Sequence, residues 1–317
     1  MASSFMTADT LSRQQGTGLA RHETFGALGE PRHFSYFAAI DWSGAVGARQ
    51  PGIAVAICGT GSETPTLVRP GHIWSRIDVL DWLLTDLPAD TLVGLDLSTS
   101  LAFADTRAFF PGWDESPADA RALWALVERI CAGDPHLSAS SFVDHHEASR
   151  HFRRHGNRTG DLFPPGRGRL RVTENAQREQ GLSPYSNFNL VGAAQVGKSS
   201  LTGMRILHRL HGKLPLWPVD PLPDAGSVVV EIYTTLAARA AGVAKGRSKM
   251  RDGATLDAAL AALGSAPHTP LPRYTDHATD ALLTAAWLRT VADDEELWNP
   301  KRLDEVRQTE GWTFGIR

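Results

Sequence analysis

Hydrophobic residues along this chain follow two patterns, short continuous runs and longer stretches with helical spacing. The runs are typical of buried strands and lie at residues 35–41, 53–57, 92–96 and 227–233, with a further candidate at 66–74. Helical spacing or composition predicts helices at residues 76–87, 114–131, 234–241 and 256–263, and from about residue 276. A turn-rich stretch, residues 47–52, joins the first two strands as a hairpin.

The order of these elements predicts an α/β fold. Three antiparallel strands are followed by a helix, a parallel fourth strand, a helix, a fifth strand and closing helices. Between the fourth and fifth strands, at about residues 133–223, periodic patterning fades and loops containing proline dominate. We therefore expect residues 33–317 to form one domain with a large insertion, preceded by a flexible leader at residues 1–32.

Composition and charge narrow the classes of function. The chain of 317 residues is 42% hydrophobic with a formal charge of −3, which is typical of an ordinary globular protein. Because no global positive field attracts nucleic acid, any basic surface must be local. Two cysteines, Cys58 and Cys131, indicate no disulfide framework, and no apolar run reaches 18 residues. We expect a cytoplasmic protein without a membrane segment.

Three aspartates stand at the ends of apolar segments. Asp41 and Asp96 end predicted strands, and Asp280 opens an apolar helix. An unpaired carboxylate in buried surroundings is costly, so these side chains are expected to bind cations. If the two strands are neighbours, the acids meet at one edge of the sheet and form an oxygen-ligand site of the kind that Mg²⁺ or Mn²⁺ prefers.

The motifs around these acids resemble those of the domain-of-unknown-function family of predicted RNase H-like nucleases, and more distantly the RuvC resolvases. The motifs are Ala-Ile-Asp-Trp-Ser-Gly at 39–44, Gly-Leu-Asp-Leu-Ser at 94–98, Val-Val-Glu-Ile-Tyr at 229–233 and His-Ala-Thr-Asp-Ala-Leu at 277–282. The resemblance spans about residues 36–292. It implies an RNase H-like mixed five-stranded sheet flanked by helices, and a nuclease that hydrolyses phosphodiester bonds by a two-metal-ion mechanism.

By this resemblance, Asp41, Asp96 and Asp280 ligate two divalent ions. His277 lies three residues before Asp280, on the same side of a helix, and serves as a metal ligand or positions the attacking water. Glu231 interrupts an apolar strand, where it either completes the acidic cluster or faces solvent on an edge strand.

Each acid also has a structural interpretation. Asp41 can begin a turn into Ser43 and Gly44, and Asp96 can cap a turn with Ser98. A first-turn position in the helix would let Asp280 interact with the macrodipole. Asp276 is expected to be the N-cap of that helix.

A second motif, Gly192 to Ser199, matches the phosphate-loop pattern G-x-x-x-x-G-K-S. Such a loop follows a buried strand, and residues 183–191 offer only a weak one. Two alternatives to the nuclease therefore stay open. The first is a nucleotide-binding NTPase or kinase-like enzyme that uses this loop or the hairpin at Asp41 to Gly44, and the second is a non-catalytic binding protein.

The middle of the chain carries a local basic segment at residues 144–171. Its arginines are Arg150, Arg153, Arg154, Arg158, Arg167, Arg169 and Arg171. Such a segment either contacts a nucleic-acid backbone through its phosphates or forms a solvated loop. The side chains that we expect to bind substrate phosphates are Arg153, Arg154, Arg158 and Lys198.

Overall fold

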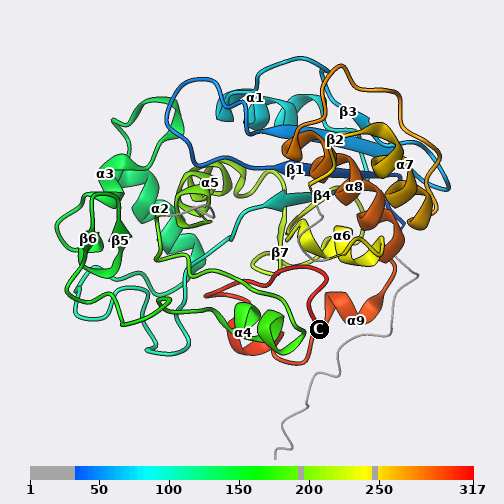
Figure 1. Cartoon of the computed structure of the whole chain (residues 1–317). Coiled ribbons are helices and arrows are strands. Elements are labelled where there is room, and N and C mark those ends of the chain that lie inside the picture. The colour runs from blue at the N-terminus through cyan, green and yellow to red at the C-terminus, as the bar shows by residue number, and fades with distance from the viewer. Residues whose placement is uncertain (1–32, 192–195, 245–248) are drawn as a thin grey trace, which may run out of the picture. The chain divides into compact units, whose positions relative to one another are not determined.

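A mixed six-stranded sheet with helices on both faces organises the computed structural model (Figure 1). The structure describes residues 33–191, 196–244 and 249–317, so the predicted leader at 1–32 lies outside the described residues. The strands are β1 (Tyr36–Asp41), β2 (Ala54–Gly59), β3 (Thr66–Leu67), β4 (Thr91–Asp96), β7 (Leu216–Trp217) and β8 (Val228–Glu231). Their order in the sheet is β3-β2-β1-β4-β8-β7.

The pairing of the strands confirms the expected α/β arrangement. β2 runs antiparallel to β1 and to β3, whereas β4 runs parallel to β1 and β8 runs parallel to β4. The prediction of five strands is wrong, because β7 pairs in parallel with β8 and comes from within the predicted insertion. β3 is also shorter than predicted.

The helices largely follow the predicted spacing. They are α1 (Arg76–Asp81), continued by a π-helical turn (Trp82–Asp86), α2 (Ala120–Ile130), α3 (Ser140–Val143), α4 (Val172–Glu179), α5 (Val196–Leu210), α6 (Thr235–Ala240), α7 (Gly253–Ala262), α8 (Asp276–Val291), α9 (Glu295–Trp298) and α10 (Leu303–Val306). Two short 3-10 helices, Pro135–Leu137 and Ala148–His151, lie between α2 and a small two-stranded sheet of β5 (Arg153–Arg154) and β6 (Arg158–Thr159). No helix in the described ranges is both long and apolar enough to cross a membrane.

Alternate residues of β1 face two different cores. Ala38 and Ile40 are buried in the core that includes residues of α1, α2 and α5. Phe37 and Ala39 are buried in the opposite core, against residues of α6, α7 and α8. Because both faces are covered, the strand reads as a continuous apolar run, which explains why its sequence predicted a buried strand.

The segment 133–223 is more regular than its sequence suggested. It contains α4, and α5 alone is 15 residues long. The buried positions Leu201, Met204, Leu207 and Leu210 lie three residues apart, which keeps them near one face of a helix. These residues share a core with Ile40 of the central strand. The prediction of a loop-rich insertion is therefore wrong for this part of the chain.

Candidate active site

A cavity of about 330 Å³ opens at the carboxyl ends of β1, β4 and β8. All five residues that the sequence predicted as catalytic line it, namely Asp41, Asp96, Glu231, His277 and Asp280. We call this space the acidic cavity. Ligand sites in open α/β sheets commonly lie at this edge, where loops leave the carboxyl ends of parallel strands.

The sheet and α8 bring the three aspartates together from distant parts of the chain. Asp41 and Asp96 are register partners on adjacent parallel strands. α8 packs against β1 and β2, and its first two turns carry His277 and Asp280 to the same cavity. The helix begins there because the Thr275 side chain accepts a hydrogen bond from the amide of Ala278, 3.2 Å away.

Burial and the charges of neighbouring acids raise the pKa of all three aspartates. Burial raises the pKa of Asp96 well above its ordinary value, and the charges of Asp41 and Asp280 add to this effect. Burial, followed by the charge of Asp41, raises the pKa of Asp280 to about 7. The cavity therefore holds more negative charge than its own side chains neutralise, which is the condition that favours binding of a cation.

His277 partly offsets this charge through Asp41. Its Nδ1 atom lies 3.1 Å from Oδ1 of Asp41. This hydrogen bond raises the pKa of His277. Burial still raises the pKa of Asp41 overall, although the hydrogen bond to His277 opposes that shift. His277 is thus positioned to carry a proton beside the first-strand acid.

The first turn of α8 differs from the prediction in one respect. Thr275 is the N-cap, so the prediction of Asp276 as the cap is wrong by one residue. Asp276 instead lines the acidic cavity and pairs with Arg251 at 2.8 Å and with Lys249 at 3.2 Å. It also occupies the first-turn position that was considered for Asp280, which leaves the macrodipole interpretation of Asp280 without support.

Glu231 belongs to a buried charged network rather than to an exposed edge. β8 lies between β4 and β7, and Glu231 is 2% exposed, so the solvent-facing alternative is wrong. Its Oε1 and Oε2 atoms accept hydrogen bonds from Arg171 at 2.5 and 2.8 Å. The amide and hydroxyl of Thr99 also donate to Oε2, at 2.7 and 3.0 Å.

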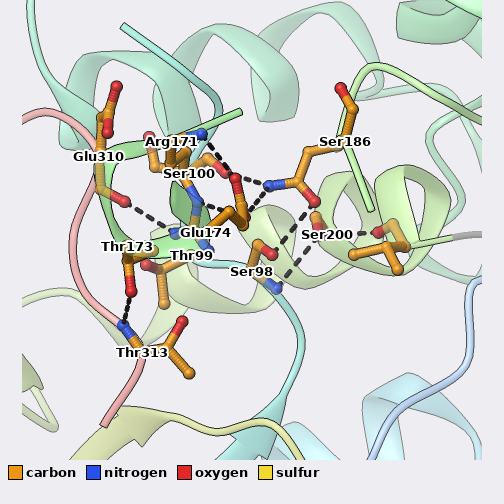
Figure 2. A network of polar contacts seen from close by, with 12 residues as sticks. Ser98, Thr99, Ser100, Arg171, Thr173, Glu174, Ser186, Ser200, Glu310 and Thr313 are labelled. Carbon is orange, nitrogen blue, oxygen red and sulfur yellow. Dashed lines mark hydrogen bonds and ion pairs between the residues drawn. The ribbon is translucent and has the colours of Figure 1, made fainter. Parts of the chain in front are cut away.

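The same network extends to α4 and α5 (Figure 2). Glu174 accepts a hydrogen bond from Nε of Arg171 at 2.8 Å and another from Asn187 at 3.3 Å. Ser98, the turn partner considered for Asp96, donates its hydroxyl to Asn187 and its amide to Ser200, each at 3.1 Å. The residues that follow β4 are therefore tied to both helices beside the acidic cavity.

Arg171 corrects part of the prediction for the basic segment. It is fully buried, with both Glu231 and Glu174 as ion-pair partners. Arg169 pairs with Asp105, and Arg150 pairs with Asp161. All three arginines are therefore paired with carboxylates of the same chain, and Arg171 is enclosed within the fold.

The predicted phosphate-binding side chains divide between two places. Arg154, Arg158 and Lys198 line a second cavity of about 170 Å³. Arg153 is exposed, and it is not among the described residues that line either cavity. Its amide and carbonyl pair with the backbone of Phe188 and Leu190.

The Gly192 to Ser199 motif has a different context from that of a phosphate loop. Its last four residues begin α5, and residues 192–195 lie outside the described residues. The described stretch before it makes an isolated bridge from Asn189 to Arg153 and does not join the six-stranded sheet. Gly197 packs closely, because an added Cβ would lie 2.1 Å from the carbonyl oxygen of Asn187. The NTPase hypothesis stays a prediction, because the described residues before the motif do not form the sheet strand that a phosphate loop follows.

Two tyrosines at the acidic cavity were not predicted to belong to the site. Tyr185, which is 50% exposed, and Tyr233 both line it. Tyr233 is the last residue of the Val-Val-Glu-Ile-Tyr motif, two residues after β8 ends, so its position could have been inferred from the sequence. Tyr185 lies in an irregular segment, and only the tertiary structure brings it to the cavity.

In the described ranges of the chain, no group of three or more histidine, cysteine, aspartate or glutamate side chains stands ready to hold a metal ion. Comparisons with protein-family models, curated proteins and solved structures found no match. The resemblance to predicted nucleases therefore rests on the motifs in the sequence, and the functional argument rests on the chemistry of the site.

Proposed function

We propose that this protein is a divalent-metal-dependent nuclease of RNase H-like fold that hydrolyses phosphodiester bonds in nucleic acid. The observation that carries the proposal is the convergence of Asp41, Asp96 and Asp280 on one cavity, with the pKa of each carboxylate raised. Natural proteins rarely bury mutually repelling carboxylates without a purpose, because burial of uncompensated charge is costly.

The strand order supports the fold assignment within this proposal. The sequence β3-β2-β1-β4-β8, with the first three strands antiparallel and the last three parallel, agrees with the order that the motif resemblance implies. The first-strand acid and the fourth-strand acid then fall side by side, and the helix acid arrives from α8. β7 extends the sheet beyond these elements.

The donor set suits Mg²⁺ or Mn²⁺. Asp41, Asp96 and Asp280 offer carboxylate oxygens, which these hard cations prefer. When bound, two such ions would activate water and stabilise the attacking and leaving oxygens of an in-line displacement. The three aspartates do not already form a compact ligand group, so the proposal requires a bound cation to draw them closer together.

The remaining residues of the cavity have separate roles. The raised pKa of His277 favours a protonated imidazole beside Asp41, which is placed to pass this proton on as the cavity changes charge. Among the described residues that line the cavity, Arg171 is the one arginine or lysine, and its guanidinium is held by Glu231 and Glu174. Glu231 therefore anchors the end of β8 and leaves the aspartates to meet the cation.

Cleavage assays with matched variants test the proposal. We expect the purified wild type to cleave at least one of three labelled substrates, single-stranded DNA, duplex DNA or RNA, in Mn²⁺. Asp41→Asn and Asp96→Asn should lower the rate by roughly 100-fold or more, whereas the exposed Asp81→Asn should leave it unchanged. Calorimetry should show Mn²⁺ binding to wild type and to Asp81→Asn but not to Asp41→Asn. Folded wild type that binds neither Mn²⁺ nor Mg²⁺ would overturn the proposal.

A further inference from the structure

The second cavity, which we call the basic cavity, carries an excess of positive charge. Among the described residues that line it are three cations, Arg154, Arg158 and Lys198, and one carboxylate, Asp144. Oδ1 of Asp144 accepts hydrogen bonds from Arg154 at 2.8 Å and from Arg158 at 3.2 Å. One carboxylate is thus shared by two guanidinium groups, and the cavity stays positive.

The acidic and basic cavities share a wall. Ser199 lines the acidic cavity, and its neighbour Lys198 lines the basic one. The facing loop repeats this arrangement, because Trp42 lines the acidic cavity and Gly44 lines the basic one.

The two sides of this wall are in direct contact. An added Cβ on Gly44 would lie 2.5 Å from the amide nitrogen of Ser199. The indole of Trp42 also donates a hydrogen bond to Thr202 of α5 at 3.1 Å. Neighbouring residues of the same backbone thus border the two cavities, and the Cα atoms of such neighbours are only about 3.8 Å apart.

We infer that the basic cavity binds a backbone phosphate next to the one that is cleaved, an inference that rests on the proposed function. Arginine forks and a lysine ammonium are the groups that bind phosphate oxygens most strongly in proteins. A polynucleotide whose scissile phosphate lies in the acidic cavity carries another phosphate across the wall. The substrate is therefore a polynucleotide rather than a compound with one phosphodiester.

Phosphate binding is measured first without metal or substrate. Inorganic phosphate is titrated into ¹⁵N-labelled protein, and the side-chain Nε–H signals of Arg154 and Arg158 are followed by NMR. We expect saturable shifts in the wild type and in Lys213→Met, an exposed control lysine outside the basic cavity. Lys198→Met should raise the dissociation constant at least about tenfold, because a charge-assisted hydrogen bond is lost.

Asp144→Asn moves the affinity in the opposite direction. The asparagine keeps the shape of the side chain but releases both guanidinium groups from a competing anion, so the phosphate dissociation constant should fall about tenfold. Absence of saturable shifts in the wild type, or equal affinity in all four proteins, would overturn the inference.

Cleavage kinetics then assign the phosphate to the substrate. Lys198→Met should raise KM for an oligonucleotide about tenfold but leave KM unchanged for bis(p-nitrophenyl) phosphate, which has one phosphodiester and reaches only the acidic cavity. Equal effects on both substrates, or no effect on either, would refute the assignment. A wild type that binds phosphate but cleaves nothing would instead refute the proposed nuclease function, and the substrate assignment with it.

Discussion

Asp41 and Asp96 are register partners at the carboxyl ends of two adjacent parallel strands. Their side chains both line the acidic cavity, although 54 residues of sequence separate them, between positions 41 and 96. Parallel pairing imposes this proximity, because it places equivalent ends of both strands at the same edge. The consequence is that the charge of Asp41 adds to burial in raising the pKa of Asp96.

The first prediction concerns the pH dependence of stability in the metal-free protein. The pKa of Asp280 rises from 3.8 to about 7 on folding, so between these values the folded state holds a proton that the unfolded state has lost. Stability therefore falls as pH rises from about 4 to about 7. Asn cannot ionise, so Asp280→Asn should be more stable than wild type at pH 8 by up to about 4 kcal/mol.

Urea denaturation at pH 5, 6, 7 and 8 measures this difference. The gain in unfolding free energy should grow with pH and reach a plateau above pH 7. Asp81→Asn, which changes an exposed aspartate of α1, should show no such growth. A gain that is the same at every pH would contradict the raised pKa of Asp280.

The second prediction concerns the buried ion pair beside the cavity. Arg171→Met leaves Glu231 and Glu174 as uncompensated buried carboxylates, so it should lower the unfolding free energy by about 3–5 kcal/mol. Arg178→Met, at an exposed position of α4, should change it by less than about 0.5 kcal/mol. Chemical denaturation provides both values. Equal stability of the two variants would show that the network does not hold the fold.

A companion variant separates structure from metal binding at Glu231. Glu231→Gln removes the charge that Arg171 pairs with, so we expect a loss of stability. Its Mn²⁺ dissociation constant, measured by calorimetry on folded protein, should stay within about threefold of the wild-type value, because we propose that the three aspartates supply the ligands. A much larger loss of Mn²⁺ affinity would make Glu231 a ligand, as the motif resemblance allowed.

The third prediction concerns the wall between the cavities. A methyl group at Gly44 would overlap the backbone of Lys198 and Ser199, so Gly44→Ala should destabilise the protein by about 1–3 kcal/mol. We also expect weaker binding of both Mn²⁺ and phosphate, since the wall borders both cavities. Gly133→Ala is the control, because nothing lies within 4 Å of its added Cβ. Thermal unfolding and the two binding assays compare the variants. Equal unfolding temperatures and equal affinities for Mn²⁺ and phosphate in both variants would contradict the shared wall.

The insertion shows where local sequence patterns lose their predictive power. The basic segment at 144–171 reads as one surface, but Arg171 is buried against Glu231, which lies 60 residues further along the chain. Arg154, in the same segment, reaches a cavity with Lys198 of α5. Nothing local distinguishes these arginines, because the partner that decides each one's role comes from a distant element.

The amino-acid sequence by itself determined the buried strands β1, β4 and β8, the acids that end them, and the helix that carries His277 and Asp280. Apolar runs can only be buried, and a charged residue at the end of such a run marks where the chain leaves the core. Only the tertiary structure decided which charges meet. Ion pairing depends on distances of a few ångströms between side chains, and strand order and helix packing set those distances rather than spacing along the chain.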